Sequence, residues 1–305
     1  MNKWIYNLIV IGILLIVVFL TGCSASKEEV FKIGFIPSEQ ANELMPKAEL
    51  LGDFLEKEMG MKVEVVVPTS YEPLMESLRF NHIDAAYMDS GPAWLAYKSS
   101  GAEVVMAELK DGLPFYYAEM FTQADSDLMS LDDAIGKKIA FTSWTGSSGF
   151  VMPVGTLVQR GLITVDGDDF PALQKALDES FETNIISGGY TQSLQLLLAG
   201  AVDIVGGSHD ALEKYLEEED RIKLKSIERL GKVPSHPIVV RNELSPEIRK
   251  KFVTAMLKLN EKENVHILQN LYNVEGLVQT TTEEHLADFG PRLDALVGLH
   301  DKVLK

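Results

Sequence analysis

The chain has 305 residues, of which 46% are hydrophobic, 24% charged and 8% aromatic; this composition is typical of folded globular proteins and excludes a disordered or low-complexity chain. Lys and Arg total 28 against 45 Asp and Glu, and the resulting formal net charge of −17 excludes the basic surface that nucleic acids require. The single cysteine, Cys23, excludes an intramolecular disulfide and a thiolate-rich metal site.

The N-terminal residues predict a secreted, lipid-anchored protein. An uncharged run, 8–20, has the length of a signal-peptide core but is short for a membrane span. It leads into a Leu-Thr-Gly-Cys sequence at 20–23, which resembles a bacterial lipobox, whose cysteine thiol receives a diacylglyceryl group. We expect 1–22 to be a lipoprotein signal peptide, Cys23 to be the lipidated residue and 23–29 to be a tether. The alternative is an uncleaved N-terminal anchor with an incidental cysteine.

Short apolar runs then alternate with amphipathic segments. We expect strands at Val30–Ile36, Val63–Val67, Asp84–Met88, Glu103–Ala107 and Lys138–Thr142, with helices at 44–59, near 73–81 and from Pro92. This alternation is typical of βαβ units on a mainly parallel sheet. The sequence therefore predicts an α/β fold.

The chain also contains an internal similarity. Tyr71 precedes Asp84 by the same interval as Tyr190 precedes Asp203, and apolar residues recur in step between them. Such a repeat indicates two lobes of similar plan. The alternative is a chance similarity of the kind that any α/β protein can show.

The segment 143–150 is the strongest candidate for a binding loop. It is rich in hydroxyls and glycines, and it lies between a strand and an expected helix start. Free backbone N–H groups and the helix dipole favour an anion at such a place, and Ser and Thr hydroxyls add donors without a competing charge. The segment lacks the lysine and the spacing of a P-loop, so nucleotide hydrolysis is not indicated. The alternative is an ordinary capped helix start.

Other expected strand ends carry polar and aromatic side chains. Open α/β sheets bind ligands beyond the carboxyl ends of their strands, so these residues predict a small-molecule pocket. The residues are Tyr71, Asp89, Ser90, Trp94, Tyr190, Gln192, His209, Asp210 and His236.

Catalytic and metal sites are weakly supported. Ser147 or Ser148 can be combined with a histidine and Asp210 into a triad, but no Gly-x-Ser-x-Gly motif frames either serine. The six histidines lack paired metal-ligand spacing. We therefore expect neither an enzyme nor a metal or other cofactor.

The sequence resembles the phosphate/phosphite/phosphonate-type substrate-binding lipoproteins of ABC transporters, which are type II periplasmic binding proteins. The resemblance covers roughly 30–275 and rests on the segments Ile33–Pro37, 71–84, Thr142–Pro153, Tyr190–Asp203 and 237–247. It implies two similar mixed-sheet lobes joined by a two-strand hinge near 117–122 and 230–233. Lobe 1 would comprise 28–118 plus 233–305, and lobe 2 would comprise 119–232.

The resemblance also implies roles for residues. The sequence Gly146-Ser147-Ser148-Gly149 occupies the place of the Ser-Thr-Ser-Gly turn that grips an oxyanion in this family, with Thr145 next to the position where a hydroxyl has become glycine. Gln192 and His236 stand where acidic residues are usual. Both departures disfavour an aminophosphonate and favour a smaller or unaminated oxyanion.

We therefore expect a monomeric extracytoplasmic receptor that closes its lobes around a phosphonate, phosphite or phosphate and delivers it to an ABC permease. Ser147, Ser148 and the amides through Gly149 would hold the oxygens, and Asp210 or Asp89 would accept a hydrogen bond from a protonated ligand oxygen. The remaining expected contacts are donors from Tyr71 and Ser90 and walls formed by Trp94, Trp144 and Tyr190. The alternatives are an oxyanion sensor for a histidine kinase, a receptor for a quaternary ammonium compound held in an aromatic cage, and an enzyme of the same fold.

Overall fold

The computed structural model describes residues 30–35, 41–68, 71–144 and 146–303. The predicted signal peptide, the lipidated Cys23 and the tether lie outside the described residues, as do Thr145 and the side chain of Tyr71. These predictions are therefore not tested by the structure.

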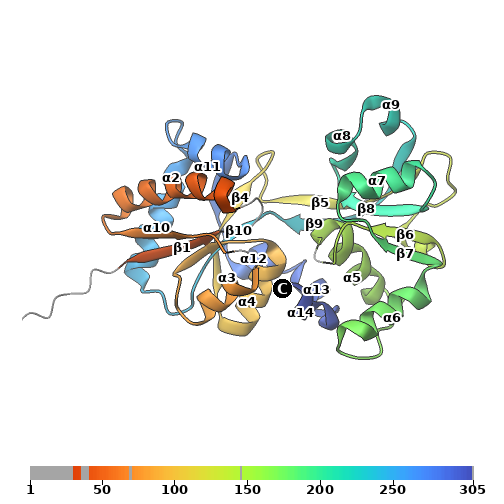
Figure 1. Cartoon of the computed structure of the whole chain (residues 1–305), viewed down its shortest axis with the longest axis horizontal. Coiled ribbons are helices and arrows are strands. Elements are labelled where there is room, and N and C mark those ends of the chain that lie inside the picture. The colour runs from red at the N-terminus through yellow and green to blue at the C-terminus, as the bar shows by residue number, and fades with distance from the viewer. Residues whose placement is uncertain (1–29, 36–40, 69–70, 145, 304–305) are drawn as a thin grey trace, which may run out of the picture. The chain divides into compact units, whose positions relative to one another are not determined.

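The first of two mixed β-sheets has the strand order β11-β4-β10-β3-β1-β2 (Figure 1). β1 pairs in parallel with β2 and β3, and β10 pairs antiparallel with β3 and β4. The strands are β1 (Phe31–Phe35), β2 (Val63–Val66), β3 (Ala85–Tyr87), β4 (Glu103–Leu109), β10 (Pro237–Val240) and β11 (Gly276–Gln279). Its helices are α2 (Ala41–Met59), α3 (Tyr71–Arg79), α4 (Ser90–Ser100), α10 (Pro246–Leu257), η3 (Lys258–Asn260), α11 (Val265–Tyr272) and α12 (Thr282–Leu286).

The second sheet has the order β7-β6-β8-β5-β9, with β6 parallel to β7 and β8. Its strands are β5 (Phe115–Gln123), β6 (Lys138–Phe141), β7 (Thr183–Ile186), β8 (Ile204–Ser208) and β9 (Leu224–Pro234). The associated helical elements are η1 (Leu131–Ala134), the π-helical turn η2 (Ser147–Val151), α5 (Met152–Gln159), α6 (Phe170–Ser180), α7 (Tyr190–Leu198), α8 (Ala211–Tyr215) and α9 (Glu218–Arg221). The chain ends in α13 (Gly290–Asp294), η4 (Val297–Leu299) and α14 (His300–Val303).

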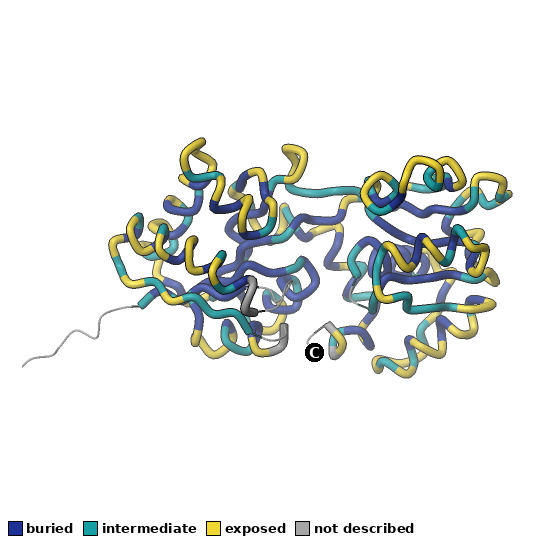
Figure 2. Tube along the Cα trace, turned by 45° about the horizontal axis from the view of Figure 1, so that its top comes forward, coloured by how far each residue is buried: buried dark blue, intermediate teal, exposed yellow. Residues whose placement is uncertain are grey.

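The apolar patterns explain these elements. The residues Leu44, Ala48, Leu51, Leu55 and Met59 form one fully buried face of α2, as their helical period predicts. Figure 2 shows the buried trace running through the central strands, while the outer turns are exposed. The expected strands and helices before residue 110 are confirmed, with ends shifted by a few residues.

The internal similarity corresponds to a shared structural device. Asp84 Oδ2 accepts a hydrogen bond from the backbone N–H of Lys32 at 2.9 Å, and Asp203 Oδ2 accepts one from the backbone N–H of Lys138 at 2.9 Å. In each lobe the aspartate directly precedes the third strand. Its hydrogen bond fixes the start of the first strand, which pairs with the third. The two lobes therefore repeat one βαβ plan.

The two-strand connection expected between the lobes corresponds to β5 and β9, which run side by side between the two sheets (Figure 1). The segments 117–122 and 230–233 lie inside β5 and β9, because these strands pair from Phe115↔Pro234 to Gln123↔Leu224. The chain passes between the sheets at 110–114 and again at 235–236. The lobe boundaries themselves stay a prediction.

We expect Asp84→Asn and Asp203→Asn each to lower the free energy of unfolding, by about 1–3 kcal/mol, because hydrogen bonds to a charged acceptor are stronger than those to a neutral one. Asp84→Asn should cost more, since Asp84 also pairs with Arg241 at 2.8 Å while both side chains are mostly buried. Urea unfolding measures both effects, with the exposed Asp53→Asn as control. If neither variant is less stable than the control, the shared device does not hold the strands.

Candidate functional site

A cavity of about 320 Å³ is lined by side chains from both sheets. One wall contains Asp89, Ser90, Glu108, Ser235 and His236, and the other contains Ser147, Tyr190, Ser208, Asp210 and Tyr215. The lining also contains Phe115, Tyr116 and Tyr117 of β5, together with Lys110, Asp111, Leu113, His209, Lys214 and Pro234. The cavity thus lies where the ends of strands from both sheets face the same space.

The second-sheet wall is built on the start of a helix. Gly146 precedes η2, and its carbonyl accepts the first bonds, from the N–H groups of Phe150 and Val151. No side chain caps this start among the described residues. The amides of Ser147, Ser148 and Gly149 come before the first helical hydrogen bond, so they have no partner within the helix. Ser147 lines the cavity beside them.

The glycines of this loop are required by Thr142. A Cβ at Gly149 would lie 2.2 Å from Thr142 Oγ1, and a Cβ at Gly146 would lie 2.4 Å from the same atom. The loop therefore folds tightly over Thr142, whose hydroxyl is buried without a hydrogen-bond partner in the described part of the chain. This crowding explains why glycine stands at 146, where the resembled family has a hydroxyl.

Hydroxyl groups gather next to the amides. Ser148 is fully buried, and its Oγ lies 2.7 Å from the hydroxyl of Tyr190. The ring of Tyr190 stacks on Tyr215 with centroids 5.3 Å apart. Burial raises the pKa of both Tyr190 and Tyr116, so both phenols keep their protons at neutral pH. This wall therefore presents neutral hydrogen-bond donors to the cavity, beside the charged side chains of Asp210 and Lys214.

A charged cluster forms the opposite wall. His236 Nε2 lies 2.9 Å from Asp89 Oδ1, and its Nδ1 lies 3.2 Å from Glu108 Oε1. Glu108 also accepts a hydrogen bond of 2.7 Å from the hydroxyl of the buried Tyr87. Burial lowers the pKa of His236, but the carboxylates of Glu108 and Asp89 outweigh it and raise the pKa to about 10. At neutral pH the cluster holds one cation between two anions.

Two further predicted residues, Ser90 and Asp210, have hydrogen-bond partners within the protein. Ser90 Oγ donates to the carbonyl of Pro234 at 3.0 Å and lies 3.3 Å from that of Ser235. Asp210 precedes α8 without capping it. Its pKa is lowered although burial raises it, because the Ser208 hydroxyl and the Asp210 amide bond to the carboxylate. Asp210 is therefore an ionised acceptor at the cavity.

The structure brings together Ser90, Ser147, Tyr190, Asp210 and His236 around the cavity. It does not place among the lining residues the predicted Trp94, Trp144, Gln192, Gly146, Ser148 and Gly149. Trp94 Nε1 donates to Asp294 at 2.9 Å, whereas the ring of Trp144 packs against Phe170, with centroids 4.8 Å apart. Gln192 is exposed on α7. Among the described side chains the aromatic cage expected for a cation is thus not assembled, because both tryptophans pack elsewhere.

Sequence reasoning missed Glu108 and Tyr116. Glu108 interrupts the apolar strand β4, and a buried glutamate needs a charged or hydrogen-bonded partner. That interruption was the available signal, but its partner, His236, is remote in sequence. Among the described residues, no group of three or more His, Cys, Asp or Glu side chains could hold a metal ion.

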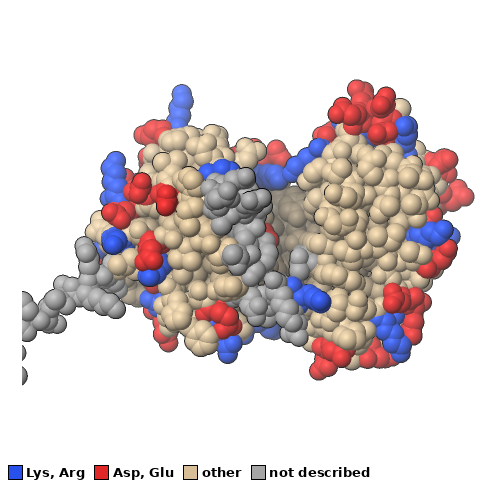
Figure 3. Space-filling view, in the orientation of Figure 1, with Lys and Arg blue, Asp and Glu red and all other residues tan. Residues whose placement is uncertain are grey.

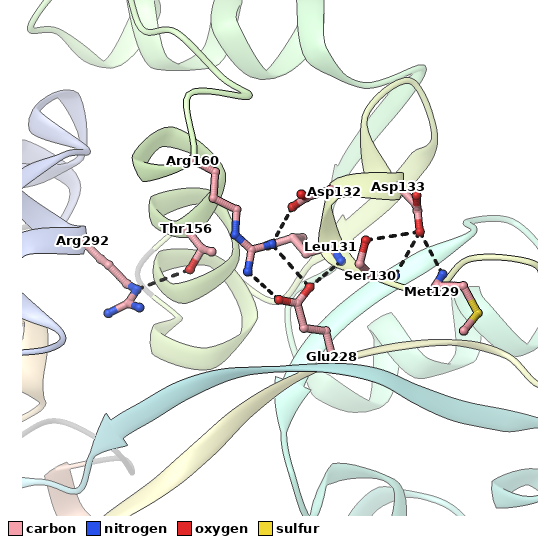
Figure 4. A network of polar contacts seen from close by, with 9 residues as sticks. All are labelled: Met129, Ser130, Leu131, Asp132, Asp133, Thr156, Arg160, Glu228 and Arg292. Atoms are coloured by element: carbon pink, nitrogen blue, oxygen red, sulfur yellow. Dashed lines mark hydrogen bonds and ion pairs between the residues drawn. The ribbon is translucent and has the colours of Figure 1, made fainter.

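Helix α5, which continues from the binding loop, is fixed at its far end (Figure 4). Arg160 pairs with Asp132 of η1 and with Glu228 of β9, at 2.5 Å in each case. Arg292 Nε donates to Thr156 at 3.3 Å.

Asp and Glu side chains gather at the outer end of the second lobe, over α9 (Figure 3). On the face shown, an acidic patch therefore lies over α9, which has no buried residue.

We expect His236 to stay protonated from about pH 5 to pH 8, which NMR titration of the imidazole measures. Because its pKa in the folded state exceeds the ordinary value of 6.5, its charge contributes stability that is fully present below about pH 6.5 and lost as pH rises through about 10. In Glu108→Gln the pKa of His236 should fall, since one of the two carboxylates that raise it is gone. Titration of wild-type His236 near 6.5 contradicts the charged cluster.

None of the helices in the described residues is sufficiently long and apolar to span a membrane.

Comparisons with known proteins identify relatives of the chain as a whole. The phosphate-import protein PhnD of Mycolicibacterium smegmatis is 25% identical over 277 residues, covering 88% of this chain and 82% of that protein. The phosphonates-binding periplasmic protein of Escherichia coli K12 is 25% identical over 233 residues, and the match covers 74% of this chain but only 64% of that protein. PhnD1 of Prochlorococcus marinus in complex with methylphosphonate shares the fold, with a TM-score of 0.61, 17% identity, and coverage of 88% of this chain and 100% of that one.

The fold prediction of two mixed-sheet lobes of the type II periplasmic binding protein class is confirmed. The sequence profile described as "ABC transporter, phosphonate, periplasmic substrate-binding protein" matches residues 33–285. That match spans most of the chain, so this protein belongs to the family of periplasmic substrate-binding proteins of phosphonate ABC transporters.

Proposed function

We propose that this chain is a lipid-anchored extracytoplasmic receptor that binds a phosphorus oxyanion in the cavity and delivers it, as a monomer and without transforming it, to an ABC permease. The observation that carries the proposal is the uncapped helix start at Ser147–Gly149, whose first residue, Ser147, lines the cavity beside the hydroxyl of Tyr190. Such a site stabilises negative oxygens through backbone N–H groups and the helix dipole.

The ligand oxygens would bind to the wall formed by Ser147 and Tyr190. Neutral donors at contact distance suffice although the chain carries a net charge of −17, because salt screens exposed carboxylates beyond about 8–10 Å. Tyr116 lies beside the hydroxyl of Ser148, and the hydrogen bond between the two is one of the influences on the pKa of Tyr116. A phosphonate or phosphate would therefore meet several donors without displacing a charged side chain.

The opposite wall sets a second requirement. Asp89 on this wall and Asp210 on the facing wall line the cavity as carboxylates, and a carboxylate accepts several hydrogen bonds. A protonated ligand oxygen would donate to one of them, whereas a fully ionised ligand would face like charge. His236 reduces this repulsion because it is charged, but it is held between Asp89 and Glu108. The proposed ligand is thus a monoprotonated oxyanion.

We expect Ser147→Ala to weaken binding of methylphosphonate, phosphite or phosphate by about 10- to 150-fold, since a hydrogen bond to a charged group contributes roughly 1.5–3 kcal/mol. Ser147→Ala/Ser148→Ala should abolish measurable binding, because Ser148 also orients Tyr190. Isothermal titration calorimetry measures the affinities, and Ser226→Ala on the exposed face of β9 is the control. Affinities equal to the control's reject this site.

We expect Cys23→Ser to release the protein from the membrane fraction of the bacterium that expresses it, because the thiol that would carry the lipid is gone. Mass spectrometry of the wild-type protein should show a diacylglyceryl group on an N-terminal Cys23. Ser24→Ala is the matched control, and it should stay with the membrane. A wild-type protein that begins at Met1 contradicts the lipid anchor.

A further inference from the structure

The last part of the chain, residues 286–303, packs against helices of both lobes (Figure 1). Here it is called the C-terminal strut. Its α13 contacts α4 of the first lobe and α5 of the second, and η4 contacts α6. The lobes are therefore joined in three places: by the two passages of the chain at 110–114 and 235–236, and by this strut.

The strut connects the hydrophobic cores of the two lobes. Its buried side chains belong to one cluster that includes Leu78 and Ala96 of the first lobe and Phe150 and Leu157 of the second. Those side chains are Leu286, Phe289, Leu293, Leu296 and Leu299. Separating the strut from either lobe would expose apolar surface to water, which opposes the separation.

Polar bonds and close packing attach the strut to the first lobe. Trp94 Nε1 donates to Asp294 Oδ1 at 2.9 Å, and Lys98 Nζ lies 3.4 Å from Asp294 Oδ2. A Cβ at Gly290 would lie 2.5 Å from atoms of the Trp94 indole, so the backbone rests directly on that ring. Trp94 thus anchors the strut, which accounts for its absence from the cavity.

The attachment to the second lobe is equally close. A Cβ at Gly155 of α5 would lie 2.8 Å from Arg292 Cβ, and a Cβ at Gly298 would lie 2.1 Å from the carbonyl oxygen of Asp169. Arg292 also donates to Thr156 of α5 (Figure 4). Backbone contacts of this kind leave little freedom for the strut to slide on α5 and α6.

The two clamped helices are the ones whose starts face the cavity. α4 begins at Ser90, directly after Asp89, and the helix that continues as α5 begins at Ser147. We infer that the strut sets the separation of these two starts, and that Trp94 and Asp294 are positioning residues for ligand capture although they do not touch the ligand. The consequence for ligand affinity rests on the proposed function, whereas the effect on lobe separation does not.

Lobe separation can be measured without any ligand. Spin labels on the exposed positions Glu49→Cys of α2 and Gln195→Cys of α7, in a Cys23→Ser background, report the distance between the lobes by pulsed electron spin resonance. We expect Trp94→Phe and Asp294→Ala each to broaden this distance distribution, because each removes the same hydrogen bond. Because the hydrogen bond is shared, the double variant should broaden the distribution by less than the two single variants added together.

Control variants separate positioning from general destabilisation. Asp294→Asn keeps an acceptor for the indole N–H, so its distance distribution should have the wild-type width. Glu228→Gln breaks the ion pair with Arg160 inside the second lobe and should lower the melting temperature without changing the distance. If Trp94→Phe and Asp294→Ala lower the melting temperature but leave the distribution at its wild-type width, the strut has no positioning role and the inference is overturned.

Affinity provides the second measurement. Since apparent affinity depends on the fraction of molecules in the binding-competent arrangement, Trp94→Phe and Asp294→Ala should each change the dissociation constant for methylphosphonate by at least about threefold, and Asp294→Asn should not. Dissociation constants that stay within twofold of wild type overturn the role in ligand capture. If wild-type protein itself binds no methylphosphonate, phosphite or phosphate, the proposed function fails and the distance measurement still tests the strut.

Discussion

Backbone amides that precede the first hydrogen bond of a helix have no partner inside the helix, and this constraint governs the site. At Ser147–Gly149 no side chain of the described residues caps the helix, and Gly146 and Gly149 let the loop close over Thr142. A side chain that capped the helix would stabilise it locally by about 1 kcal/mol but would occupy the donors. The uncapped start therefore lowers the local stability of the helix, and it leaves the N–H groups available to an external oxyanion.

Much of the fold follows from local patterns, and so it could be predicted. Apolar periodicity located α2, and the interval between Tyr190 and Asp203 marked a second copy of the plan that ends at Asp84. The loop 143–150 was identifiable because its hydroxyls and glycines adjoin one another in sequence. Each of these signals depends on residues that are close in sequence, so it can be recognised without knowledge of the tertiary arrangement.

The remaining features depend on pairings between distant residues. His236 meets Glu108 because β10 pairs antiparallel with β4, and the sequence carries no sign of that register. Trp94 resembles a pocket wall from its position after a strand end, but its indole N–H is paired with Asp294, two hundred residues later. A residue type and a strand end therefore indicate a candidate site, whereas the direction of the side chain is decided by packing.

The two walls of the cavity differ in chemistry, and this difference limits the ligand more than the size of the cavity does. One wall offers amides and phenol protons, so it favours oxygens that carry negative charge. The other holds a cation between two anions and leaves one negative charge in excess, so it penalises a second charge on the ligand. A group that accepts hydrogen bonds on one side and donates one on the other satisfies both walls. Since His236 keeps its proton well above neutral pH, this balance depends on the protonation of the ligand and not on that of the cluster.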